Sequence, residues 1–179
     1  MVERIEQQLA QVILYLGAIE ALAEMARACG TQQQDAFLFQ TVYESLWDGV
    51  IVRIGTIWDK SKNVGSLPKL SMELKRLKTA AALLASKEID EAESDERRRL
   101  REWRHMVVAH SSLALNPENF DMKNGISVND VRSETEHVER LLLSASSALG
   151  RTPVYYGILK EDALENARRS LGKWQRNVT

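Results

Sequence analysis

The strongest constraint on the fold of this chain is a helical spacing of apolar residues that proline hardly interrupts. Apolar residues recur every three or four positions over residues 2–28 and again over residues 34–59. Residues at this spacing share one face of an α-helix. With only three prolines in 179 residues, the sequence predicts two long helices. Gly49 and Gly55 in the second helix would let a neighbouring helix approach closely.

Further helices are indicated between residues 66 and 110. Ser66 followed by Pro68 is typical of a helix start, and regularly spaced leucines predict that this helix runs to about residue 85. The next helix is expected to begin at Ser86 or Asp90 and to end close to His110. Its first turns would be acidic and its later turns basic, an order that complements the helix macrodipole.

The C-terminal third is predicted to contain two more helices. Ser127 with Asp130 resembles a capping box, which would open a helix to Leu149. A last, more polar helix is expected over residues 160–175. The short segment 154–156, which contains two tyrosines, is β-prone, and we expect it to be extended.

These elements predict an all-α fold, an up-and-down bundle of four to five main helices with a C-terminal helical extension. We expect the bundle to occupy residues 1–150 and the extension, within the same domain, to occupy residues 151–179. A chain of this length can bury a sizeable core as one domain.

The composition is ordinary for a soluble globular protein, with 44% hydrophobic and 27% charged residues. The formal net charge of −1 provides no overall basic field, so any attraction for phosphate has to be local. The single cysteine, Cys29, can form no internal disulfide, which fits a reducing compartment. The N-terminus lacks the layout of a signal peptide, and no apolar run approaches the ~20 residues of a membrane-spanning helix. We therefore expect a cytoplasmic protein without a membrane partner.

Few residues in the chain can carry chemistry. Neither metal-ligand spacing nor a glycine-rich phosphate loop occurs in the sequence, so we expect no metal and no cofactor. One of the three histidines, His137, lies among three glutamates, where a solvated or ion-paired surface role is expected. The other two, His105 and His110, follow a run of arginines.

The arginine run itself allows two interpretations. Arg97–Arg99, with Arg101 and Arg104, could form a ridge that binds phosphate. The alternative is helical pairing with acidic residues one turn earlier, Glu93 with Arg97 and Asp95 with Arg99. Residues 87–104 contain six basic and seven acidic side chains. For the run as a whole we favour pairing.

Arg104 and His110 flank a short apolar run, residues 106–109, that would anchor the helix. Six residues place two helical side chains about 120° apart and ~9 Å along the axis, so one helix cannot easily bring both to one small group. Two copies of the chain around a two-fold axis could bring an arginine and a histidine to the same group. The pairing suits RNA cleavage by the 2′-hydroxyl, because histidine transfers protons near neutral pH and arginine binds phosphate. The alternative, which the spacing alone favours, is an arginine–carboxylate pair and a histidine that bonds the last carbonyls of the helix.

Two motifs within residues 37–112 resemble the HEPN superfamily. The segment LREWRHMVVAHS (residues 100–111) is similar to its R-x4-6-H signature, in the AbiU-like branch associated with bacterial abortive infection. Upstream, residues 43–59 resemble that branch's long helix, which ends in an aromatic residue and an aspartate, here Asp59. Residues 65–70 (GSLPKL) resemble the helix start that follows it.

This resemblance implies a HEPN-like bundle, usually a homodimer, with a composite metal-independent ribonuclease site. By position in the motif, Arg104 would bind the scissile phosphate, His110 would serve as the acid and base, and His105 would assist. The partners it implies are RNA, a second copy of the chain, and a cognate antitoxin or nucleotidyltransferase. Further RNA contacts are expected from residues around the motif: Arg97, Arg101 and Ser111.

We therefore expect a toxin-like endoribonuclease of antiviral defence. Some HEPN proteins are inactive scaffolds, so the alternative is a non-catalytic helical module that binds RNA or a protein partner. The near-neutral charge and the excess of apolar helical surface favour this alternative.

Overall fold

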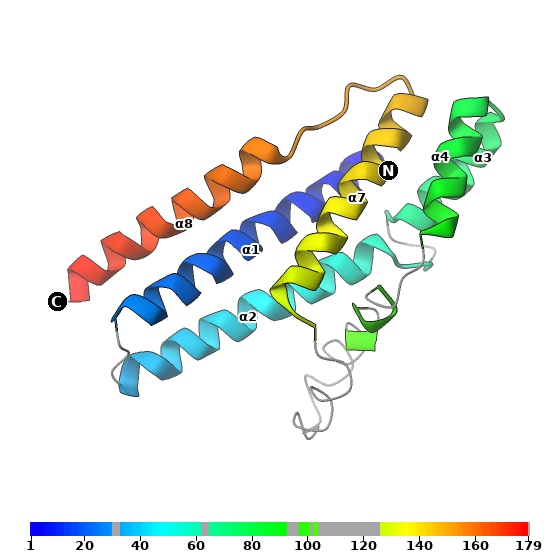
Figure 1. Ribbon diagram of the computed structural model, residues 1–179. Helices are drawn as coiled ribbons and strands as arrows, with labels where there is room; N and C mark the ends of the chain where they lie inside the picture. The colour runs from blue at the N-terminus through cyan, green and yellow to red at the C-terminus, as the bar shows by residue number, and fades with distance from the viewer. Residues whose placement is uncertain (30–32, 62–64, 93–96, 101, 104–125, 179) are drawn as a thin grey trace. The chain divides into compact units, whose positions relative to one another are not determined.

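α-Helices make up most of the part of the chain that the structure describes. The computed structural model describes residues 1–29, 33–61, 65–92, 97–100, 102–103 and 126–178. Every regular element in these ranges is an α-helix, which confirms the predicted all-α fold. The labelled helices (Figure 1) are α1 (Val2–Cys29), α2 (Gln33–Ile57), α3 (Leu67–Leu77), α4 (Ala80–Glu91), α7 (Val128–Ala148) and α8 (Gly157–Val178).

Several helix ends confirm the sequence predictions. α1 and α2 match the two predicted long helices to within two residues at each end. The predicted capping box opens α7, because the backbone N–H of Asp130 donates to Ser127 Oγ (3.1 Å) and the Asp130 carboxylate accepts from the backbone N–H of Ser127 (2.7 Å). Gly150, with φ of 66°, follows the end of α7. α8 begins at Gly157, three residues earlier than expected.

The single helix predicted from Ser66 to residue 85 is wrong in its extent, because the chain turns after residue 77. Lys78 adopts a left-handed backbone conformation (φ 56°, ψ 13°) that ends α3. Thr79 then caps α4 by accepting a hydrogen bond from the backbone N–H of Ala82 (3.2 Å). Two short helices therefore replace one long helix.

The helix start predicted at Ser86 or Asp90 is wrong for the same reason, since both residues lie inside α4. The described acidic residues, Glu88, Asp90 and Glu91, thus occupy the last turns of a helix, and the macrodipole argument does not apply to them. Asp90 is stabilised by contacts with α3 instead, a hydrogen bond from Ser71 Oγ (2.6 Å) and an ion pair with Lys75. Burial opposes ionisation of Asp90, but these two contacts outweigh burial and lower its pKa.

The chain divides into two compact units. The first unit contains Met1–Leu9 and Ile51–Val154, and the second contains Ala10–Val50 and Tyr155–Thr179. α1 and α2 each contribute to both units. The domain boundary expected at residue 150 stays a prediction.

In the second unit, α1 packs closely against both α2 and α8 (Figure 1). A Cβ added at Gly17 would lie 2.9 Å from the carbonyl carbon of Ala163 in α8. A Cβ added at Gly49 would lie 2.6 Å from the Tyr15 ring, which confirms the prediction of a close helix approach at Gly49. The two glycines therefore set the helix spacing in this unit.

In the first unit, α3 and α4 form a helical hairpin, and α4 packs against α7. The apolar faces of these helices meet in a buried core. Its largest fully buried apolar side chains are Ile5, Leu9, Ile51, Ile54, Ile57, Leu67, Leu70, Leu74 and Leu100.

One described helix, α1 over Val2–Arg27, is long and apolar enough to cross a membrane by length and composition alone. By length and composition, this helix therefore does not meet the expectation that no apolar stretch approaches the length of a membrane-spanning helix. A core helix of a soluble protein has the same length and composition, and 44% of the most apolar stretch of this helix is buried. The helix thus gives only weak evidence for a membrane span.

Candidate functional site

Most of the predicted site residues lie outside the part of the chain that the structure describes. They are Arg101, Arg104, His105, His110 and Ser111, and their roles stay predictions. Arg97 is described, and residues 97–100 and 102–103 around it are helical. The structure therefore shows how the segment that leads into the predicted motif is held.

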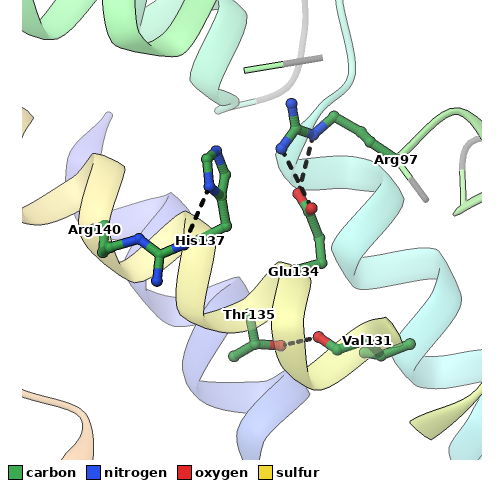
Figure 2. A network of polar contacts seen from close by, with 6 residues as sticks. All are labelled: Arg97, Val131, Glu134, Thr135, His137 and Arg140. Atoms are coloured by element: carbon green, nitrogen blue, oxygen red, sulfur yellow. Dashed lines mark hydrogen bonds and ion pairs between the residues drawn. The ribbon is translucent and has the colours of Figure 1, made fainter. Parts of the chain in front are cut away.

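Arg97 lies in the interior of the first unit. Its side chain is 2% exposed, and that of its partner Glu134 in α7 is 4% exposed. Arg97 Nε donates to Glu134 Oε1 (3.0 Å) and Nη2 donates to Oε2 (3.3 Å), as Figure 2 shows. Two parallel hydrogen bonds make this a bidentate pair, which fixes orientation as well as distance.

An aromatic ring covers one face of the same guanidinium. The Arg97 Cζ atom lies 3.5 Å from the ring centroid of Trp58, which is 5% exposed and directly follows α2. A cation over an aromatic face is attracted by the ring quadrupole. The next residue, Asp59, accepts a hydrogen bond from the backbone N–H of Ser61 (2.8 Å). Its side chain therefore forms a local turn directly after α2. We call Arg97, Glu134 and Trp58 the Arg97 cluster.

This position differs from the interpretation of Arg97 as a phosphate-binding residue, and the pairing expected with Glu93 lies outside the described residues. A side chain that is 2% exposed is not presented to solvent as an RNA contact requires. The carboxylate that it pairs with, Glu134, is distant in sequence. Arg97 acts here as an internal link between helices.

Sequence reasoning missed the partner side chain, although the sequence carried a signal. Glu134 follows Val131 by three positions and precedes Val138 by four, and both valines are completely buried. Glu134 therefore falls on the apolar face of α7. A carboxylate on a buried face requires a hydrogen-bonding or cationic partner.

The two neighbouring arginines are more accessible. Arg98 is exposed and Arg99 is half-buried. Hydrogen bonding from Ser127 lowers the pKa of Asp130 most, and the nearby Arg99 charge lowers it further. Arg99 thus lies close to the start of α7, while its expected partner, Asp95, is outside the described residues.

His137, one turn after Glu134 in α7, is half-buried, whereas we expected a solvated or ion-paired surface residue. Arg140 Nη2 donates to its Nδ1 atom over 3.4 Å (Figure 2). Because a guanidinium can only donate, Nδ1 is the acceptor and the neutral ring carries its proton on Nε2. Burial lowers the pKa of His137, and the charges of Arg97 and Arg140 lower it further.

A groove of about 660 Å³ runs between α4 and α7 in the first unit. Glu88 and Glu91 line one wall, and His137 and Arg140 line the other. Both signs of charge are present, so the groove has no evident preference for phosphate. Among the described residues, no group of three or more histidine, cysteine or carboxylate side chains could bind a metal ion.

The all-α fold of the described residues and the arginine–histidine motif of the sequence agree with the class that the sequence resembles, the HEPN-type proteins. The family model HEPN_AbiU2, described as AbiU2, matches residues 1–169 of the chain. The chain therefore belongs to the AbiU2 family of the HEPN superfamily, which confirms the resemblance and makes the chain a HEPN module of an abortive-infection family. No curated protein and no solved structure matches the chain significantly.

Proposed function

We propose that the chain is a metal-independent endoribonuclease of the abortive-infection type. Its site would be composite, with Arg104 and His110 supplied across a homodimer and His105 in support. The observation that carries the proposal is the Arg-x5-His motif in a chain whose AbiU2 family match covers residues 1–169.

The chemistry assigns one task to each group. His110 takes the proton of a ribose 2′-hydroxyl, whose oxygen then attacks the adjacent phosphorus. The bond from phosphorus to the 5′-oxygen breaks, and that oxygen takes up a proton given by the protonated His110, which returns to its neutral form. The products are a 2′,3′-cyclic phosphate and a 5′-hydroxyl. Arg104 binds the phosphate and stabilises the negative charge that develops in the transition state.

RNA cleavage in the presence of EDTA tests this proposal. Wild-type protein is incubated with total RNA, and Arg104→Ala and His110→Ala are compared with it. Loss of cutting in both variants supports the proposal. Arg169→Ala is the matched arginine control, because Arg169 is exposed and its pair with Glu165 (2.7 Å) lies within one turn of the same helix. The proposal is wrong if neither motif variant loses activity, or if the wild type cuts nothing under any condition.

The composite site also requires an oligomer. On the one regular helix that the sequence predicts, Arg104 and His110 would be about 120° apart, so a single copy would not easily bring both to one phosphate. Light scattering at micromolar concentration should therefore give the mass of a dimer. A monomer would count against the composite site even if the protein cuts RNA.

A different observation favours a second candidate function, non-catalytic binding of a protein partner. The second unit has an apolar groove of about 210 Å³. Exposed large apolar side chains of α2, Leu38 and Val42, lie on its rim. A His110→Ala variant as toxic to a host cell as the wild type would favour this candidate over the enzyme. The groove is lined by Leu22, Met25, Leu38, Phe39, Val42 and Leu171.

A further inference from the structure

The Arg97 cluster connects three segments of the first unit at one point. Trp58 directly follows α2, Arg97 belongs to the helical residues 97–100, and Glu134 lies in α7. Stacking on Trp58 restrains the plane of the guanidinium, and the bidentate pair restrains its rotation within that plane. The backbone at Arg97 is therefore held in orientation as well as in position.

Stability alone does not explain a charge at this position. Removing a guanidinium and a carboxylate from water is costly, and apolar residues of similar volume are often as stabilising or more so. Leu100, one turn after Arg97, is 1% exposed and shows that the same helical segment also buries apolar side chains. What the ion pair adds to apolar packing is a directional contact.

The cluster also stands at a defined distance from the motif in the sequence. Arg97 precedes Arg104 by seven residues, which is nearly two turns of the helix expected there. If that helix continues as the sequence predicts, a restraint on the orientation of residue 97 would restrain the direction of its later side chains.

We infer that Arg97, Glu134 and Trp58 are positioning residues for the ribonuclease motif. They orient the segment that carries Arg104 and His110, and they do not touch RNA. This inference rests on the proposed function. A misplacement of about 1 Å can slow an enzymatic reaction about a hundredfold, so a directional anchor two turns away affects the rate.

The test replaces the pair with apolar residues of similar size, in the double variant Arg97→Met/Glu134→Leu. Turnover is measured on a fluorophore-labelled random-sequence oligoribonucleotide in EDTA, and hydrogen exchange is measured on the peptide over residues 97–103. We expect kcat to fall by at least about tenfold with little change in KM, because groups that act only in the transition state are misplaced. Exchange of the peptide should become faster while the midpoint of unfolding stays close to that of the wild type.

The control is the pair of Arg168 and Glu24 in the second unit, which is also bidentate (2.7 and 2.6 Å) but about half exposed. The variant Arg168→Met/Glu24→Gln should change neither kcat nor the exchange of residues 97–103. Arg97→Lys keeps the positive charge but cannot form the bidentate contact with Glu134, so it should also lower kcat. A loss of activity that follows only the unfolded fraction would indicate a purely structural role.

The outcomes separate this inference from the proposed function. If the double variant keeps kcat within about twofold, a change too small for lost orientation, and its exchange is unchanged, the positioning role is overturned while the ribonuclease stands. If the wild type cuts no RNA, the ribonuclease is overturned, and hydrogen exchange alone decides the anchoring. Faster exchange in the double variant then supports the anchor, and unchanged exchange overturns it.

Discussion

Replacing Glu134 with leucine tests whether the Arg97 cluster is as buried in solution as in the structure. The change removes the carboxylate that pairs with the Arg97 guanidinium, which is 2% exposed. Breaking a buried ion pair from one side costs roughly 3–5 kcal/mol, because the remaining charge is desolvated and unpaired. In a chain of this size each kcal/mol lowers Tm by about 2–4 °C, so we expect a fall of roughly 6–20 °C.

The double variant Arg97→Met/Glu134→Leu provides the second half of this experiment. It removes both charges of the pair, so its free energy of unfolding should lie within about 1 kcal/mol of the wild type or above it. Urea unfolding, followed by tryptophan fluorescence and by circular dichroism, measures all variants at one protein concentration. Glu24→Gln, which breaks the exposed pair with Arg168, should change the midpoint little.

A small effect of Glu134→Leu would refute the reasoning. A cost below about 1 kcal/mol is what exposed ion pairs show, and it would mean that water reaches the pair in solution. A double variant as unstable as the single variant would also contradict it, because the penalty would then come from packing and not from an unpaired charge.

Three further predictions concern backbone geometry and pH. Gly17→Ala should lower the free energy of unfolding by about 1–3 kcal/mol through overpacking against the backbone of α8, whereas Gly172→Ala, with nothing within 4 Å of the added Cβ, should not. Lys78→Gly should raise stability and Gly150→Ala should lower it, each by about 1 kcal/mol, because both positions have positive φ; effects of one sign in urea unfolding would contradict this. Burial and two nearby guanidinium groups hold the pKa of His137 below 6.5 in the folded chain, so the unfolded chain binds more protons and stability falls as the pH drops from 6.5 through the folded pKa. His137→Gln should flatten this dependence in unfolding measured between pH 7 and 5, and an unchanged slope would show that His137 is solvated.

The parts of the fold that follow from local rules were predictable from the sequence. The long apolar periods of α1 and α2 and the capping box of α7 depend only on residues within a few positions of each other. The break between α3 and α4 was not predictable in this way. It depends on a left-handed conformation at Lys78, which residues other than glycine and asparagine seldom adopt, and the alanines and leucines that follow favour a continuous helix.

The candidate site shows the same division between local and long-range information. The pairing rule for helices considers partners three or four positions apart and therefore offered Glu93 for Arg97. Glu93 lies outside the described residues, and the partner that the described residues provide, Glu134, is 37 positions away. A carboxylate on the apolar face of α7 indicates that a cationic partner is needed. The chain has 24 lysines and arginines, however, and only the packing of the helices determines which of them pairs with Glu134. The selected arginine, Arg97, lies seven residues before the motif arginine, Arg104. Loss of the buried pair could therefore lower both the stability of the protein and its rate of RNA cleavage. Both quantities have to be measured on the same variants to separate the two effects.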